Sequence, residues 1–136
     1  MGAVRVAASL QLASVVALLA GTIVACAEAQ FPFDREMLLD VPALAGSKRV
    51  PILEILGDGR AMVDLWCRSG EGRAEVAGDA IKFILGPMRE ESCTPERLQR
   101  DDDLAMALVQ VTQWRLEDDI VVLIGPAELR YRLSTH

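Results

Sequence analysis

The sequence has a single histidine and fewer basic than acidic residues. The histidine is His136, so a serine or cysteine nucleophile within the chain would lack the usual imidazole base. Fourteen Lys and Arg residues stand against 20 Asp and Glu residues, which gives a net charge of −6. This balance lacks the basic face with which nucleic-acid-binding proteins meet phosphates. We therefore expect neither histidine-dependent catalysis nor a nucleic-acid partner.

Aromatic residues are also scarce, at 4% of the chain. Two carboxylates suffice for glycoside hydrolysis, but sugar sites usually offer aromatic platforms, which weakens the hypothesis of a carboxylate hydrolase. The run Asp101-Asp102-Asp103 offers oxygens to Ca²⁺, yet it lacks the alternating spacing of an EF-hand loop. We expect this run to cap a helix and form a solvated acidic edge. The sequence therefore predicts no enzyme, and no catalytic, cofactor-binding or metal-binding residues.

The first 29 residues have the pattern of a secretory signal. Arg5 is the only charged residue before Glu28, and a largely apolar stretch lies between them. A short positive start, an apolar stretch and small residues after it are typical of a cleaved leader. Ala27-Glu28-Ala29 is an A-x-A site, so cleavage there would leave Gln30 as the new amino terminus.

Two alternatives compete with simple cleavage. Ile23-Val24-Ala25-Cys26 resembles a bacterial lipobox, in which Cys26 would be lipidated and become the first residue of the mature protein. The stretch could also be a retained anchor, since about 20 apolar residues can span a bilayer. All three interpretations place residues 31–136 outside the cytoplasm. We expect an exported protein, periplasmic or anchored in the outer membrane, that contacts the membrane only through the signal segment or a lipid on Cys26.

The mature domain then holds two cysteines, Cys67 and Cys93. An even pair in an oxidising compartment predicts a disulfide, which would close a loop of about 27 residues and contribute roughly 3–4 kcal/mol. Two buried free thiols are the alternative. A metal site is weaker still, because the chain has no CxxC motif and no internal histidine.

The remaining chain is expected to form a short amino-terminal linker and strand (residues 30–48) followed by one domain (residues 49–136). Two hairpin turns are predicted at Asp58-Gly59 and Gly78-Asp79. Residues 69–72 and Gly86-Pro87 are expected to interrupt the strands. Short strands are predicted over residues 36–41, 50–56, 61–67, 74–77, 81–85, 120–124 and 129–133.

One helix is predicted late in the chain. Thr94-Pro95-Glu96 has the chemistry of a helix start, while Leu104, Leu108 and Val111 share one helical face. We place the helix over residues 101–112, with a continuous start from Pro95 as the alternative, and expect Trp114 in the core. Neighbouring strands joined by short turns and one helix predict an α+β domain with an antiparallel sheet that curves over the helix.

Several of these residues together resemble a known family. The matching segments are Asp58-Gly59-Arg60, Cys67 followed by Ser69-Gly70, residues 81–87, and Cys93-Thr94-Pro95. Their order is similar to that of the META domain (HslJ-like) family of small exported bacterial proteins, over residues 50–134. The family's helix corresponds to residues 101–108, and its final strand pair corresponds to residues 119–125 and 128–133. The chain departs from the family at Trp66-Cys67-Arg68, where Gly-Cys-Asn is common, and it lacks the early Gly-x-Trp strand.

The resemblance implies a small curved, half-barrel-like antiparallel sheet packed on one main helix, located in the envelope and often lipid-anchored. The family's two motif cysteines correspond to Cys67 and Cys93. No catalytic residues are established for the family, so none is transferred to this chain.

Trp66 and Met62 are the candidates for a contact surface. Val63 and Leu65 alternate with them and are expected to line the core, so Met62 and Trp66 point to the opposite face. A helix covering that face is the alternative for Trp66. We expect a non-enzymatic envelope protein that acts through protein contacts or supports the envelope under stress. The second hypothesis is a carrier of a small apolar molecule or lipid on the concave side of the sheet, which would need a cavity of several hundred Å³.

Overall fold

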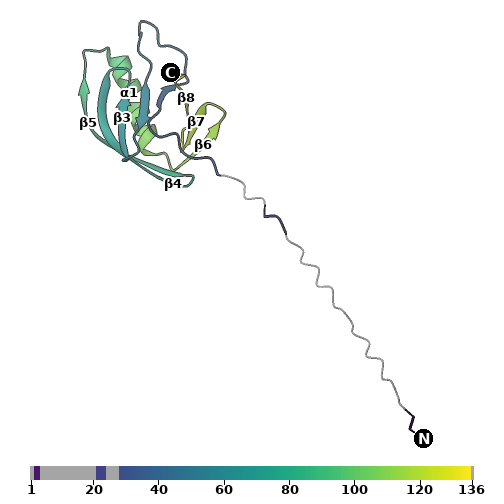
Figure 1. Cartoon of the computed structure of the whole chain (residues 1–136). Coiled ribbons are helices and arrows are strands. Elements are labelled where there is room, and N and C mark those ends of the chain that lie inside the picture. Colours follow the sequence, from purple (N-terminus) through teal and green to yellow (C-terminus); the bar gives the residue numbers. More distant parts are fainter. Residues whose placement is uncertain (1, 4–20, 24–27, 136) are drawn as a thin grey trace.

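The computed structural model of the chain describes residues 2–3, 21–23 and 28–135. Cys26, Ala27 and most of the expected signal segment lie outside the described residues. Eight strands and one helix follow one another in the part that is described (Figure 1). They are β1 (Glu36–Leu39), β2 (Ile52–Ile55), β3 (Arg60–Asp64), β4 (Arg68–Ala77), β5 (Ala80–Glu90), α1 (Pro95–Val109), β6 (Gln113–Glu117), β7 (Ile120–Ile124) and β8 (Leu129–Leu133).

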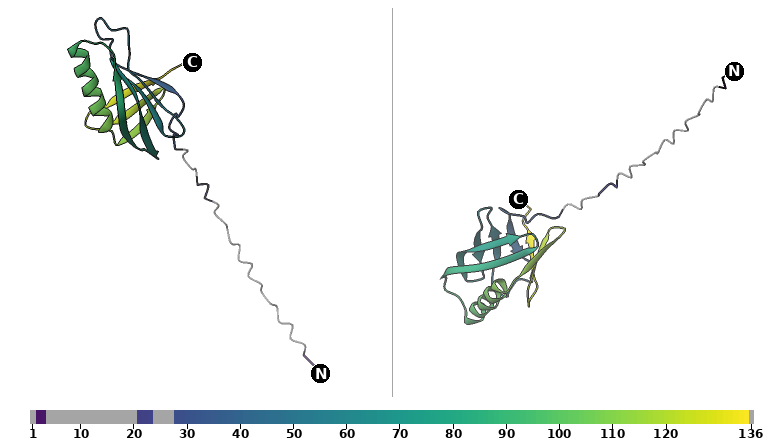
Figure 2. Two further views of the ribbon diagram at one scale, coloured as in Figure 1. Left: turned by 90° about the vertical axis from the view of Figure 1, so that its left-hand side faces the viewer. Right: turned by 90° about the horizontal axis from the view of Figure 1, so that it is seen from below.

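The strands form an antiparallel sheet in sequence order, which confirms the prediction of a sheet-dominated, antiparallel α+β fold. The sheet closes on itself, because β1 pairs with β8 through Met37 and Leu133 among other residues. The result is a closed barrel, where the family resemblance implies a half-barrel-like sheet. The narrowest join is between β5 and β6, which pair only at Ala80 and Gln113. The helix α1 connects these two strands in the chain and lies alongside β5 (Figure 2).

Both predicted hairpin turns are present. Gly59 (φ +88°) and Gly78 (φ +58°) adopt the left-handed conformation that glycine tolerates without steric cost. A third tight turn, between β6 and β7, places Asp118 at φ +54°. These turns connect β2 with β3, β4 with β5, and β6 with β7, as expected for a meander of short strands.

The predicted breaks in β4 and β5 are wrong. Residues 69–72 lie inside β4, and Gly86-Pro87 lies inside β5. A Cβ added at Gly72 would lie 2.5 Å from the Ile84 carbonyl oxygen, and one at Gly86 would lie 2.5 Å from the Glu71 carbonyl oxygen. The glycines therefore allow the two backbones to approach closely around a bulge, instead of ending the strands.

The helix starts earlier than the predicted residues 101–112, in agreement with the alternative start at Pro95. Thr94 is the N-cap, and its hydroxyl oxygen accepts the backbone N–H of Arg97. Proline in the first turn needs no hydrogen-bond partner for its nitrogen. The helix runs without interruption to Val109. The Asp101–Asp103 run therefore lies within the helix and does not cap its start.

The core is built from alternate strand residues together with one face of the helix. Val63, Leu65 and Cys67 are buried on one face, as predicted, whereas Met62 is 41% exposed. Leu104 and Leu108 of α1 belong to the same cluster of buried residues as the strand side chains. The largest completely buried side chains are Tyr131, Met37, Leu53, Ile55, Leu65, Leu108 and Leu123.

The strand β6 was not predicted. It carries Trp114, which is buried as expected but lies on a strand and not on the helical face. The Trp114 ring packs edge-on against Phe31, with ring centroids 5.0 Å apart. Among the residues that the structure describes, no helix combines the length and apolar character needed to cross a membrane.

Candidate functional site

A buried carboxylate on α1 holds the segment that follows β3. Asp101 is completely buried, and its carboxylate accepts backbone N–H groups from three consecutive residues. The distances are 2.8 Å from Trp66, 3.0 Å from Cys67 and 2.8 Å from Arg68. Burial of a charged group is costly unless the group is hydrogen-bonded, and consecutive N–H groups form a concavity that suits an anion. Asp101 therefore anchors residues 66–68 to the helix.

The prediction of a solvated acidic edge is wrong for Asp101. Its neighbours Asp102 and Asp103 are exposed, as expected, and Asp102 forms an ion pair with Arg68. The sequence did carry a signal, because Asp101 precedes Leu104 and Leu108 by three and seven positions and therefore shares their buried helical face.

The disulfide cysteines fix the same segment from a second side. The sulfurs of Cys67 and Cys93 lie at bonding distance, and their Cα atoms are 6.0 Å apart. This arrangement is consistent with the predicted disulfide. Cys93 directly precedes the helix cap Thr94, so the disulfide and Asp101 both tie the segment to α1. The other predicted cysteine site, Cys26, lies outside the described residues.

Trp66, which directly precedes Cys67, is half-buried and lines an open groove of about 340 Å³. The groove lies between α1, the end of β1 and the start of β8. It is lined by Leu39, Asp40, Val41, Trp66, Arg100, Asp103, Leu104, Ala107, Ala127, Glu128, Leu129 and Arg130. Met62 does not line it; this residue lies on β3, between Glu54 of β2 and Glu71 of β4. The structure therefore places Trp66 in the groove and Met62 outside it, so the two candidates for the contact surface do not line the same groove.

Two arginines of β8, Arg130 and Arg132, are each paired with two acids. Arg130 contacts Glu117 at 3.1 Å and Glu128 at 3.6 Å. Arg132 contacts Asp40 at 3.4 Å and Asp119 at 3.5 Å. The Arg132 pairs are exposed and the Arg130–Glu117 pair is partly buried, and pairs this close to solvent add little to stability individually. Asp40, Glu128 and Arg130 also line the groove, so these ion pairs largely neutralise the charges at its rim.

Hydrogen bonds from arginine change the ionisation of one carboxyl near this rim. The pKa of Glu117 is lowered by hydrogen bonds donated by the side chains of Arg115 and Arg130. Arg115 lies 2.7 Å from the Glu117 carboxylate, and its own pKa is raised by that hydrogen bond. Inside the barrel, burial raises the pKa of Tyr131.

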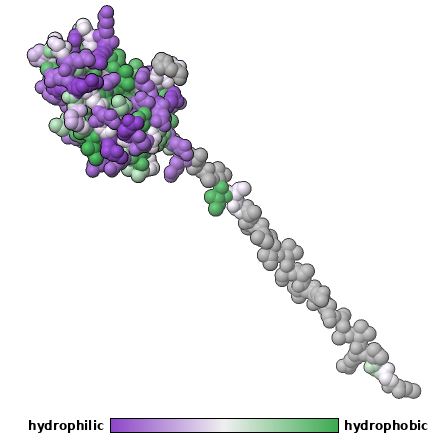
Figure 3. Space-filling view, turned by 60° about the vertical axis from the view of Figure 1, so that its left-hand side comes forward, coloured by the Kyte–Doolittle hydropathy of each residue, from purple (hydrophilic) through white to green (hydrophobic). Residues whose placement is uncertain are grey.

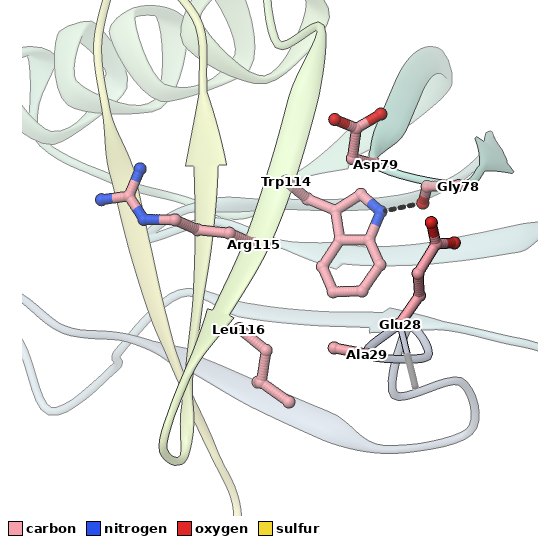
Figure 4. A pocket seen from close by; sticks show the side chains of 7 residues that line it. All are labelled: Glu28, Ala29, Gly78, Asp79, Trp114, Arg115 and Leu116. Atoms are coloured by element: carbon pink, nitrogen blue, oxygen red, sulfur yellow. Dashed lines mark hydrogen bonds between the residues drawn. The ribbon is translucent and has the colours of Figure 1, made fainter. Parts of the chain in front are cut away.

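A second cavity of about 440 Å³ lies beside β6 and the turn between β4 and β5 (Figure 4). The Trp114 indole nitrogen donates a hydrogen bond to the Gly78 carbonyl oxygen at 2.7 Å, so its polar edge already has a partner. Two of the lining residues, Glu28 and Ala29, belong to the expected signal segment. Cleavage after Ala29 would remove both of them, so this cavity is a weaker candidate for a site in the mature protein.

The surface around these cavities is mostly polar. In the view of Figure 3, hydrophobic side chains occupy several separate areas and not one continuous patch. Exposed large apolar side chains of the domain include Met62, Ile84, Met106 and Val109. No group of three potential metal ligands is present among the described residues.

The comparisons with known proteins support the fold. No family model matches the sequence, and no curated protein matches it. A solved structure described as "NMR structure of the protein" is similar, with a TM-score of 0.57 and 15% sequence identity. The similarity covers 73% of this chain and 88% of that chain. At this identity the likeness concerns the fold alone.

Proposed function

We propose that the chain is a non-enzymatic domain of the cell envelope that acts by binding at the groove beside Trp66. The observation that carries the proposal is the double attachment of residues 66–68, through Asp101 and through Cys67. A site whose wall is already rigid loses little conformational entropy on binding. Trp66 provides a large flat surface on such a wall, and tryptophan is enriched among residues that dominate binding energy.

The size of the groove favours a small apolar molecule as its occupant. About 340 Å³ lies within the range of small-molecule sites, roughly 300–1,000 Å³. The carrier hypothesis placed the ligand on the concave side of the sheet, but that space holds the packed side chains of Tyr131, Met37 and Leu53. The proposed ligand position is therefore outside the barrel, between α1 and β8.

Contact with a partner protein is the second candidate function. It is favoured by the composition of the groove, in which an apolar centre with an aromatic residue is surrounded by charged residues. Protein interfaces have the same organisation, with an apolar core and a polar rim. Both candidates depend on Trp66 and neither needs a catalytic group.

The export of the protein and its membership of the META domain family are parts of the same proposal. The leader-like residues 1–29, the two cysteines and the order of helix and strands support both. An antiparallel sheet with one helix is the fold expected for that family, although the sheet here closes into a barrel.

The intact mass of the protein recovered from the envelope of expressing bacteria tests the export. A chain starting at Gln30, with two thiols that appear only after reduction, would support a soluble envelope domain. A lipidated Cys26 would support an anchored one. A chain that retains Met1 and has free thiols would contradict the proposal.

The binding site is tested by NMR with phenol and isopropanol as small probe molecules. We expect both probes to shift the Trp66 indole and the backbone amides of Leu129 and Arg130. The variant Trp66→Ala should remove the shifts at Leu129 and Arg130. Shifts confined to the Trp114 cavity would contradict the proposed site.

A further inference from the structure

We propose that the groove beside Trp66 binds a small amphipathic carboxylate, with its apolar body on Trp66 and its carboxylate on Arg100. The inference rests on the proposal that this groove is the binding site of the protein. It adds the chemical class of the ligand and the residue that recognises the head group.

The apolar part of the groove comes from three elements. Leu39 ends β1, Leu104 and Ala107 lie on α1, and Leu129 begins β8. Trp66 joins them from the segment that Asp101 holds. An apolar body placed among these side chains would be removed from water on several sides, which provides the hydrophobic driving force for binding.

Within the described part of the chain, most charges around the groove are already paired, and the two exceptions, Arg100 and Asp103, both lie on α1. Asp40 contacts Arg132, and Glu128 contacts both Arg115 and Arg130. Within residues 28–135, Arg100 forms no ion pair, although it lines the groove from the exposed side of α1. Its guanidinium is therefore a cation that an anionic group on a ligand could match.

The chemistry of this cation favours a carboxylate head group. A guanidinium presents two parallel N–H groups that suit the two oxygens of a carboxylate. A single unpaired arginine is enough for a monoanion. Asp103 also lines the groove, and its carboxylate accepts a hydrogen bond from the Gln99 side chain, 3.0 Å away. The negative charge of Asp103 opposes an anionic ligand, so its removal should strengthen binding.

Octanoate and octyltrimethylammonium are suitable probes, because they share an eight-carbon apolar chain and carry opposite charges. Binding is followed on the protein recovered after export, by ¹⁵N NMR of the two indole signals, with Trp66→Phe used to assign them. We expect octanoate to shift the Trp66 indole and to bind at least about tenfold more tightly than the ammonium probe, as one charge-assisted hydrogen bond predicts.

Three variants separate the role of Arg100 from a general effect of charge. Arg100→Gln should weaken octanoate binding about tenfold, and Asp103→Asn should strengthen it severalfold. Arg89→Gln removes the same charge from an exposed position on β5 outside the groove, and should leave binding unchanged. All three positions are exposed, so a preserved spectrum is expected for each variant.

Equal binding of the two probes would overturn the carboxylate proposal, as would equal effects of Arg100→Gln and Arg89→Gln. Octanoate shifts that avoid the Trp66 indole would also overturn it. If phenol and isopropanol still bind beside Trp66 in those cases, the ligand class alone is wrong. If they do not, the proposed function fails as well.

Discussion

The carboxylate of Asp101 accepts the backbone N–H of Cys67 at 3.0 Å, across a separation of 34 residues. The same carboxylate also holds the N–H groups of the two neighbours, Trp66 and Arg68. One side chain on α1 thus fixes the backbone of the segment that bears both the disulfide and the groove tryptophan. The groove is therefore coupled to the helix by polar contacts as well as by apolar packing.

Replacing Asp101 should destabilise the protein strongly. In Asp101→Asn the amide cannot satisfy all three N–H groups, and buried donors without partners are costly. We expect the free energy of unfolding to fall by about 2–4 kcal/mol, measured by urea denaturation. Asp103→Asn, an exposed change on the same helix, should alter it by less than about 0.5 kcal/mol. Equal effects of the two variants would contradict the anchoring role of Asp101.

Removal of the disulfide should also lower stability. The double variant Cys67→Ser/Cys93→Ser loses the constraint on the unfolded chain, which is worth about 3 kcal/mol for a loop of this size. Thermal unfolding of the variant should match that of the parent protein in reductant. A parent protein whose melting temperature is the same with and without reductant would contradict the disulfide.

The close approach of β4 and β5 predicts a strong effect of a single methyl group. Gly86→Ala should cost more than about 2 kcal/mol, because its Cβ would lie 2.5 Å from the Glu71 carbonyl oxygen and the backbone must shift. Gly78→Ala is the matched control, since it has no atom within 4 Å and strains only its positive φ. It should cost about 1 kcal/mol. A smaller loss for Gly86→Ala than for Gly78→Ala would show that the strands are not so closely spaced.

Sequence patterns predicted the local features of this fold better than the tertiary ones. The turns at Asp58-Gly59 and Gly78-Asp79, the Thr94 cap and the buried face of β3 depend on local chemistry, and they are present. The glycines of β4 and β5 suggested loops because their spacing role depends on the opposite strand. The sequence alone could not show whether these glycines end a strand in a loop or lie within a strand at a close backbone contact.

Two other features were visible in the sequence but given the wrong interpretation. Trp114 and Leu116 alternate with polar residues, which is the period of a strand and matches β6. Asp101 lies on the apolar face of the helix, but its three backbone partners are more than 30 residues away. The helical spacing therefore indicates that Asp101 is buried, but a distant carboxylate-to-backbone contact has no local sequence pattern, so the segment that it anchors could not be predicted.

The ion pairs near β8 predict a specific dependence on pH. The ionised form of Glu117 is favoured in the folded protein, because hydrogen bonds from Arg115 and Arg130 lower its pKa. Its contribution to stability is therefore present above the ordinary pKa of glutamate, about 4.3, and is lost as pH falls through the lowered folded-state value. Carboxyl ¹³C NMR should show Glu117 titrating below ordinary glutamates.

The variant Arg115→Gln should raise the pKa of Glu117 toward its usual value, because it removes the first of the two hydrogen bonds. Arg89→Gln, which lies on β5 away from this cluster, should leave the titration unchanged. An unshifted Glu117 titration in Arg115→Gln would contradict the role assigned to this pair.

The most direct test of the account is the binding of phenol and isopropanol to the exported protein, followed by NMR. The account predicts shifts at the Trp66 indole and at the amides of Leu129 and Arg130, with the amide shifts lost in Trp66→Ala. Shifts that gather around Trp114, or that persist unchanged in Trp66→Ala, would contradict the claim that the groove beside Trp66 is the binding site.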